Sequence, residues 1–284
     1  MSQAPLQARS LTLANGRRVA LLDNGQQGKP LLIALHGWLD NAASFLPLAP
    51  HLEGFHLICI DLPGHGHSDH KPTPYVFVDW LDDLHQIVQA AGWPPFMLLG
   101  HSLGALIACA YAGVFPDQVS RLILLEGIGP LSQPDDEVPD QLRRAILNRS
   151  RTRERAAAGF ASVEEAVAAR CKVADIGVDA ARLICERQLV VREGRWHWRS
   201  DPRLRDLSPL RMSEGQARAL IRAIRSPVLF IRGEQGFAAL QTQWQQRAGA
   251  FRQIEMAVVA GNHHFHMDNS AQTAVCIESF CQIR

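Results

Sequence analysis

The fold of this chain is decided by the stretch Phe96-Met97-Leu98-Leu99-Gly100-His101-Ser102-Leu103-Gly104. Its four apolar residues are typical of a buried strand, and the small-residue segment 103–115 that follows is typical of a helix. A sharp strand-to-helix turn exposes a serine hydroxyl at the edge of a sheet, and flanking glycines let neighbouring backbone approach closely. The start of the helix also favours negative charge beside Ser102. The stretch therefore predicts a nucleophilic serine in an α/β protein.

A second apolar run, Leu31 to Leu35, ends in His36-Gly37-Trp38 and predicts a buried strand that continues into a loop. In acyl-transfer sites of this type, one oxyanion donor is the N–H of the residue after the nucleophile. The other donor comes from the loop after an earlier strand. We assign these donors to Leu103 and Trp38, and interpret His36 as structural. The alternative is that His36-Gly37 only shapes the loop.

The candidate general base lies in the stretch Gly261-Asn262-His263-His264-Phe265-His266. This stretch follows the strand-like segment 254–259, and the base is expected last in the chain order serine, acid, histidine. We therefore assign the base to His263. Three histidines within four residues also suggest a metal site, but no carboxylate or cysteine cluster at zinc spacing accompanies them. We expect neither a metal nor a cofactor, and we expect His101 to be packed or hydrogen-bonded in the core.

The acid departs from the usual arrangement. An aspartate is expected after the strand-like run 227–231, but the sequence there reads Gly233-Glu234-Gln235-Gly236, with glycine at the expected position. Two glutamates are in reach: Glu126, which ends the apolar run 122–125, and Glu234. We prefer Glu126, because a carboxylate directly after four apolar strand residues points from the sheet edge at which Ser102 emerges. The remaining alternative is that one or both are ordinary solvated loop residues.

Strand-like and helix-like segments alternate along most of the chain. Residues 11–14 and 18–22 flank Asn15-Gly16, which predicts a hairpin with a two-residue turn. Further strands are expected at 31–35, 55–60, 96–99, 121–125, 228–231 and 253–259. Helices are expected at 76–91, 103–115, 213–225, 237–248 and 270–281. This alternation indicates an α/β fold whose mainly parallel sheet is covered by helices on both faces.

The interval 128–212 breaks this alternation. It contains three amphipathic helical segments, at 141–150, 154–168 and 178–189, and no convincing series of strands. We interpret it as a helical cap inserted after the sixth strand, so that 1–127 and 213–284 form the core domain. Its arginine-rich run 143–155 predicts an anionic-substrate patch or, as we prefer, solvated helix faces. Trp196 and Trp198 suit pocket lining and simple packing equally.

Composition favours a soluble globular enzyme. The 284 residues are 47% hydrophobic and 20% charged, and a net charge of +1 gives no electrostatic reason to bind nucleic acid or membranes. No apolar run approaches the about 20 residues of a membrane span, and the N-terminal residues lack the pattern of a secretory leader. Six cysteines without paired spacing indicate reduced thiols. We therefore expect a cytoplasmic protein without a membrane span.

Four motifs, in this order along the chain, resemble the α/β-hydrolase superfamily: Leu35 to Phe45, Asp61 to Ser68, Gly100 to Gly104, and Gly261 to His263. Within it, the chain is most similar to the serine hydrolase-like proteins. The resemblance implies an α/β-hydrolase fold, with Ser102 as nucleophile, His263 as base, and Trp38 and Leu103 as oxyanion donors. It also allows an acid after the sixth strand, which fits Glu126. We interpret the loop from Asp61 to Ser68 as structural.

These residues predict a cofactor-independent serine hydrolase that acts on small to medium carboxylic esters or thioesters through an acyl-enzyme on Ser102. Its partner would be a small-molecule acyl substrate. Two alternatives stay open, because the fold alone does not determine function. One is a ligand-binding protein with impaired catalysis, which the glycine at position 236 favours. The other is a C–C lyase that uses the same serine and histidine.

Overall fold

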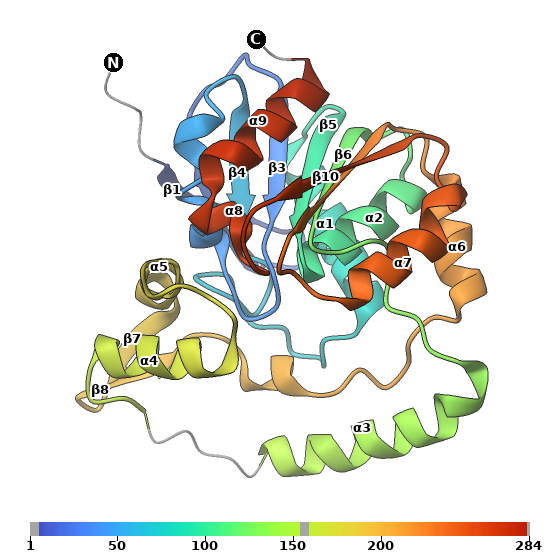
Figure 1. Ribbon diagram of the computed structural model, residues 1–284. Helices are drawn as coiled ribbons and strands as arrows, with labels where there is room; N and C mark the ends of the chain where they lie inside the picture. The colour runs from blue at the N-terminus through green and yellow to red at the C-terminus, as the bar shows by residue number, and fades with distance from the viewer. Residues whose placement is uncertain (1–5, 154–158, 283–284) are drawn as a thin grey trace.

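The computed structural model describes residues 6–153 and 159–282 and places eight of their strands in one sheet (Figure 1). The order across the sheet is β1 (Gln7–Thr12), β2 (Arg18–Asp23), β4 (His56–Ile60), β3 (Leu31–Leu35), β5 (Phe96–His101), β6 (Val119–Leu125), β9 (Val228–Gly233) and β10 (Ile254–Val259). Strand β2 is antiparallel to β1 and β4, and every pairing from β4 to β10 is parallel. The carboxyl ends of the parallel strands therefore meet at one edge.

Helices cover both faces of this sheet (Figure 1). One face carries α1 (Phe77–Ala91), α2 (Leu103–Val114), α6 (Glu214–Ala223) and α7 (Ala239–Arg247). The other carries α8 (Phe265–Asp268), α9 (Ser270–Cys281) and two short 3-10 helices, Ala42–Phe45 and Ala49–His51. The expected α/β fold with a mainly parallel sheet between helices is confirmed.

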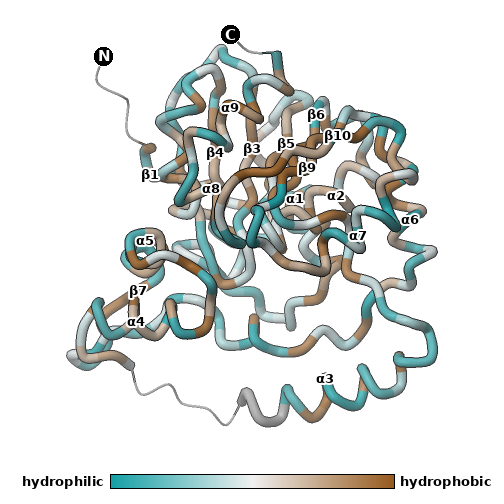
Figure 2. Tube along the Cα trace, viewed as in Figure 1, coloured by the Kyte–Doolittle hydropathy of each residue, from teal (hydrophilic) through white to brown (hydrophobic). Residues whose placement is uncertain are grey.

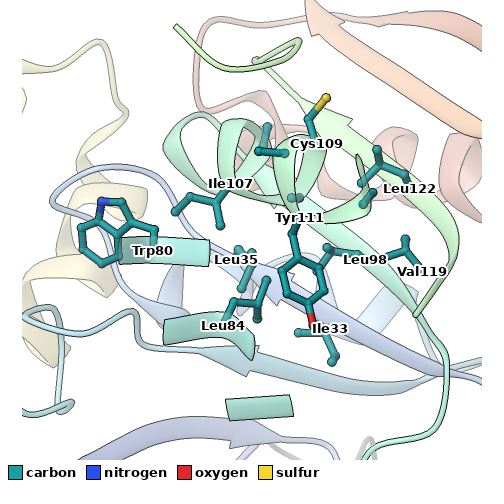
Figure 3. Packing of buried hydrophobic residues seen from close by; sticks show 14 of the residues in the cluster. Ile33, Leu35, Trp80, Leu84, Leu98, Ile107, Cys109, Tyr111, Val119 and Leu122 are labelled. Carbon is teal, nitrogen blue, oxygen red and sulfur yellow. The ribbon is translucent and has the colours of Figure 1, made fainter. Parts of the chain in front are cut away.

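Alternating strand side chains form the two cores. On the α2 side, Ile33, Leu98 and Leu122 pack with Ile107 and Tyr111, all fully buried (Figure 3). Their sequence neighbours point to the α9 side. Burying one such side chain contributes about 1.5–3 kcal/mol, and Figure 2 shows the hydrophobic colour concentrated in the central strands. This packing holds the strand ends at the carboxyl edge in fixed positions.

The first hairpin differs from the expected one. Thr12 pairs with Arg18, so the loop has five residues rather than two. Asn15-Gly16 still turns the chain: Gly16 N–H donates to Leu13 O at 2.9 Å, and Gly16 has a φ of 80°. The loop is longer because Leu13 leaves the sheet and is buried in the α2-side core.

Between β6 and β9 the chain forms a separate group of elements. They are α3 (Val138–Arg153), α4 (Val163–Val173), α5 (Val178–Gln188) and the hairpin of β7 (Leu189–Arg192) with β8 (Arg195–Trp198), preceded and followed by the 3-10 helices Asp135–Glu137 and Pro202–Arg205. Figure 1 shows α3, α4, α5 and this hairpin together on one side of the molecule. Helices α4 and α5 share a small hydrophobic core with the hairpin. We call residues 128–212 the cap segment.

Two expectations for the cap segment need correction. The helix expected at 154–168 begins instead at Val163, because Ser162 Oγ accepts a hydrogen bond from Glu165 N–H and so caps the helix there; residues 154–158 lie outside the described residues. The hairpin β7–β8 was not expected. Its turn is Glu193-Gly194, both with positive φ, and this two-residue turn between alternating residues was the available signal. Trp196 and Trp198 pack within the cap core.

Polar contacts attach the cap segment to the core domain. Arg187 of α5 pairs with the buried Asp61 at 2.8 Å, and Asn41 Nδ2 donates to Ile184 O at 2.9 Å. Asp61 Oδ2 also accepts from His67 N–H, which agrees with a structural loop after β4. Within the described part of the chain, no helix is both long and apolar enough to cross a membrane.

Candidate active site

Ser102 lies between β5 and α2 in a strained conformation. Its φ is 51° and its ψ is −115°, a combination that non-glycine residues rarely adopt. The strain is held by packing, since a Cβ on Gly104 would collide with the backbone of Leu35 and a Cβ on Gly100 with the backbone of Gly104. Ser102 N–H is fixed by Leu125 O at 2.8 Å. The residue thus has the backbone of a nucleophile elbow.

The two candidate oxyanion donors are free to bind a ligand. Leu103 N–H is at the first residue of α2, and Trp38 N–H is in the loop after β3. Within residues 6–153 and 159–282, neither N–H donates a hydrogen bond to another residue. His36 holds the loop: Nδ1–H donates to Gly37 O at 2.7 Å, and Nε2 accepts from Leu62 N–H at 3.0 Å. Burial lowers the pKa of His36, which agrees with a neutral, structural ring.

His263 lies in the loop after β10, which turns at Gly261 with a φ of 120°. Its Nδ1 is 3.1 Å from Glu126 Oε2, and its ring stacks on Phe237 with 4.0 Å between the centroids. Because the carboxylate occupies Nδ1, Nε2 is the ring nitrogen left to exchange a proton. The structure therefore pairs the expected histidine with the preferred glutamate.

Glu126 is the first residue after β6 and is almost completely buried. Its Oε1 accepts from Gly233 N–H at 2.7 Å, and its Oε2 accepts from Phe237 N–H at 3.1 Å as well as from His263. A Cβ on Gly236 would collide with this carboxylate. The carboxylate of Glu126 thus occupies the space that an aspartate at position 236 would need.

Glu234 does not reach the histidine. Its side chain is exposed, and its Oε2 accepts from Gln235 Nε2 at 3.4 Å. Ser102, Glu126 and Phe237 line one pocket of about 460 Å³, with His263 stacked on Phe237 at its edge. The structure therefore joins His263 to Glu126, which lines the same pocket as Ser102, and leaves Glu234 outside this pocket.

Comparisons with known proteins identify the family of this chain. Residues 30–177 match the family described as the alpha/beta hydrolase fold, about half of the chain. The chain belongs to the α/β-hydrolase superfamily. Within it, the chain is similar to a serine hydrolase-like protein of Dictyostelium discoideum, 32% identical over 84% of this chain and 71% of that protein. A serine hydrolase-like protein of Danio rerio is 25% identical over 90% of this chain and 82% of its own length.

A solved structure extends this likeness to the whole hydrolase chain. A hypothetical protein from Pseudomonas aeruginosa PAO1 is 33% identical and superposes with a TM-score of 0.89, covering 98% of this chain and 99% of that one. The match therefore includes the cap segment as well as the core domain.

A second pocket adjoins the first in this hydrolase. It has a volume of about 570 Å³ and shares Leu106 and Leu131 with the pocket at Ser102. Most of its other walls are apolar side chains from the start of α1, the residue before it and the end of the cap segment, among them Val76, Phe77, Trp80, Leu210 and Met212. The arginine-rich run does not line either of these two pockets. Arg143 is exposed and pairs with Asp140 at 3.3 Å, and the side chains of residues 150–158 are not among those described.

One buried group has the composition of a metal site among the described residues. It consists of Asp40, His101 and His264, whose ligand atoms lie within 4.8 Å of one another. Its carboxylate is already paired, because Oδ1 accepts from Arg170 of α4 and Oδ2 lies 3.3 Å from His264 Nε2. Two positive partners leave little reason for a third cation, so we interpret the group as an ion-paired network. Sequence reasoning missed Asp40 and Arg170.

Proposed function

We propose that this chain is a serine hydrolase that cleaves carboxylic esters or thioesters through an acyl-enzyme on Ser102. The observation that carries the proposal is the contact between His263 Nδ1 and the buried carboxylate of Glu126, beside the pocket that Ser102 lines. This is the arrangement of a nucleophile, a base and an orienting acid that acyl transfer needs. Glu126 here takes the place of the usual aspartate.

The proposed reaction has two steps. His263 Nε2 takes the hydroxyl proton of Ser102 as Oγ attacks the carbonyl carbon, and the Trp38 and Leu103 N–H groups bind the resulting oxyanion. The protonated histidine then gives this proton to the leaving alcohol or thiol as the bond to it breaks. Water repeats the sequence on the acyl-enzyme, with its proton passing through His263 back to Ser102 Oγ. Glu126 stabilises the imidazolium in both steps.

The pockets support an apolar acyl or alcohol group of small to medium size. Leu106, Leu131 and Phe237 line the cavity at Ser102, and no described residue with a net charge other than Glu126 does so. An apolar chain that enters the pocket gains about 0.8 kcal/mol per buried CH₂. The cap segment would exclude water above Ser102 and line the outer part of the path.

Free cysteines support a cytoplasmic location for this hydrolase. Cys59, Cys109, Cys171, Cys185, Cys276 and Cys281 are all unpaired, and four of them are buried. A reducing compartment keeps such thiols in this state. We propose a cytoplasmic protein with a small-molecule acyl substrate.

A fluorophosphonate probe tests the nucleophile without knowledge of the substrate, because it reacts with an activated serine. Wild-type protein should be labelled once per chain, and Ser102→Ala should not be labelled. A panel of p-nitrophenyl esters and acyl thioesters of increasing chain length then measures the acyl preference. Wild-type protein that is folded but unlabelled would contradict the proposal, and saturable binding of an acyl compound without turnover would favour the ligand-binding alternative.

A further inference from the structure

A buried polar network lies behind the candidate base and is not used by the proposed chemistry. It consists of Asp40 after β3, His101 at the end of β5, His264 after β10, and Arg170 of α4 in the cap segment. Asp40, His101 and His264 are less than about 5% exposed, and Arg170 is largely buried. Buried polar groups are costly unless they are paired, so this network calls for a role.

The contacts of His264 determine its charge. Its Nδ1 is 3.1 Å from Asp175 O, and its Nε2 is 3.3 Å from Asp40 Oδ2. Both partners are acceptors only, so both ring nitrogens must carry hydrogen, and the ring is an imidazolium. Burial lowers the pKa of His264, but the hydrogen bond and charge of Asp40 outweigh it, and the pKa is raised. Asp40 is therefore an anion between two cations, His264 and Arg170.

His101, in contrast to His264, is neutral and donates only one hydrogen bond. Its Nε2 is 2.9 Å from the carbonyl oxygen of His263, so Nε2 carries the hydrogen and donates it. Its Nδ1 has no hydrogen-bond partner and lies 3.8 Å from Asp40 Oδ2. Burial holds the pKa of His101 well below its usual value, which agrees with a neutral ring. The ring that precedes Ser102 in the sequence thus fixes the backbone of the base.

These contacts hold the backbone on both sides of the His263 ring. His101 fixes the carbonyl of His263, and Asp40 and Asp175 fix the side chain of the next residue, His264. Asn262, the residue before, donates from Nδ2 to Asp175 Oδ1 at 3.1 Å. A displacement of about 1 Å in a catalytic group can cost about 10²-fold in rate. Two of the anchoring groups, Arg170 and Asp175, belong to the cap segment.

We propose that Asp40, His101 and Arg170 are positioning residues for the base His263, and that the His264 imidazolium is the link through which the cap segment holds this base in place. The inference rests on the proposed function, because it requires His263 to act as a base. It predicts that a cap residue with no contact to the substrate pockets controls turnover. The charged and titratable groups around His264 are Asp40, Arg170, His101, His263, His266, Asp175 and Asp268.

Arg170→Met tests the proposal, with Arg182→Met as a matched control. Both arginines lie on the cap helices and pair with a carboxylate, but the Arg182–Glu164 pair at 3.2 Å is on the surface. We expect Arg170→Met to lower kcat and the rate of fluorophosphonate labelling about 10- to 100-fold, with KM changed less than about threefold. Arg182→Met should stay within about twofold of wild type, and Arg170→Lys should recover part of the loss.

A second pair of variants covers the case in which Arg170→Met does not fold. His101→Gln keeps an N–H near the position of Nε2, whereas His101→Leu removes it. We expect His101→Leu to have a lower kcat than the wild type at nearly constant KM. The kcat of His101→Gln should be at least about tenfold higher than that of His101→Leu. Nitrogen NMR adds a readout of charge at about pH 6.5, where a free imidazole is half protonated. The wild-type His264 ring should be doubly protonated at this pH, and Asp40→Asn should make it neutral.

Several outcomes would overturn the inference. Folded Arg170→Met with the same kcat as Arg182→Met would do so, and so would equal losses in His101→Gln and His101→Leu. A neutral His264 ring in the wild type, or one equivalent of tightly bound zinc in the purified protein, would contradict the ion-paired network. Failure of the proposed function is seen separately, because the wild type would then be labelled no more than Ser102→Ala.

Discussion

Replacing Glu126 by glutamine changes one atom of the candidate acid, and the structure allows its effect to be worked out. Every polar partner of the carboxylate is a donor: Gly233 N–H to Oε1 at 2.7 Å, and Phe237 N–H and His263 Nδ1–H to Oε2 at 3.1 Å each. An amide has one acceptor oxygen and one NH₂ group. The side chain of the Glu126→Gln variant must therefore turn a donor toward a donor.

The two orientations of the new amide have different costs. With its oxygen in the Oε2 position, Gly233 N–H loses its acceptor, at about 1–3 kcal/mol of folding stability, and His263 loses the charge that stabilises its protonated form. With NH₂ in that position, Nδ1 must become an acceptor. The hydrogen then sits on Nε2, which can no longer take the proton of Ser102. In either case we expect kcat to fall about 10²- to 10⁴-fold, or about 3–5 kcal/mol in the barrier.

Initial rates with p-nitrophenyl butyrate measure this loss, and thermal unfolding of the same samples separates it from instability. The control is Glu234→Gln, whose exposed side chain does not reach His263. We expect the control to stay within about twofold of the wild type. Full activity of Glu126→Gln, or a comparable loss in Glu234→Gln, would refute the assignment of the acid.

Three further predictions follow from the same contacts. Gly236→Asp alone should lower kcat at least about tenfold because its Cβ collides with the Glu126 carboxylate. The double variant Glu126→Ala with Gly236→Asp should have a kcat about tenfold higher than Glu126→Ala alone, since the acid returns to its usual place; initial rates measure both. Ser102→Gly should abolish fluorophosphonate labelling but raise the free energy of unfolding in urea by about 1 kcal/mol, because glycine relieves the strain at φ 51°. Burial lowers the pKa of His264, but Asp40 raises it by more, so the pKa is higher in the folded protein than in the unfolded chain. Protonated His264 therefore contributes its full stabilisation of the fold below the unfolded-state pKa of about 6.5, and this contribution is lost as the pH rises through the folded-state pKa. The Tm should fall over that window, and Asp40→Asn should flatten the fall.

Much of the core domain could be predicted because its signals are local. The apolar runs at β3 and β6 end where the strands end, whereas β5 continues two residues beyond its apolar run, and the helix expected at 270–281 has the bounds of α9. The spacing of Gly100 and Gly104 around Ser102 is also a local signal, and it predicted the strand-to-helix turn at this residue. The hairpin β7–β8 was missed because its strands are only four residues long and are half-buried, so their alternation is weak.

The choice of acid shows where sequence reasoning needs the sheet order. Glu126 and Glu234 both lie at strand ends, and both could follow an apolar run. Because β6 lies beside β9, the carboxylate of Glu126 meets the backbone N–H groups of Gly233 and Phe237. Glu234 points to solvent from the neighbouring strand end. The network of Asp40 and Arg170 could not be predicted, since it joins residues 130 positions apart.

Besides the contacts of Asp175 with Asn262 and His264, the cap segment and the candidate catalytic residues are attached to each other at three places among the described residues. Glu126 lies two residues before the cap segment, Trp38 Nε1 donates to Leu204 O near its end at 2.8 Å, and Arg170 pairs with Asp40 in its middle. Glu126 is itself the candidate acid, and Trp38 supplies a candidate oxyanion donor. Asp40 contacts His264, the residue after the candidate base His263. A movement of the cap segment would therefore alter the acid, the oxyanion loop and the base together. For this reason, substitutions in the cap segment should change kcat as well as substrate preference, whereas a lid that only covers the pocket would change KM alone.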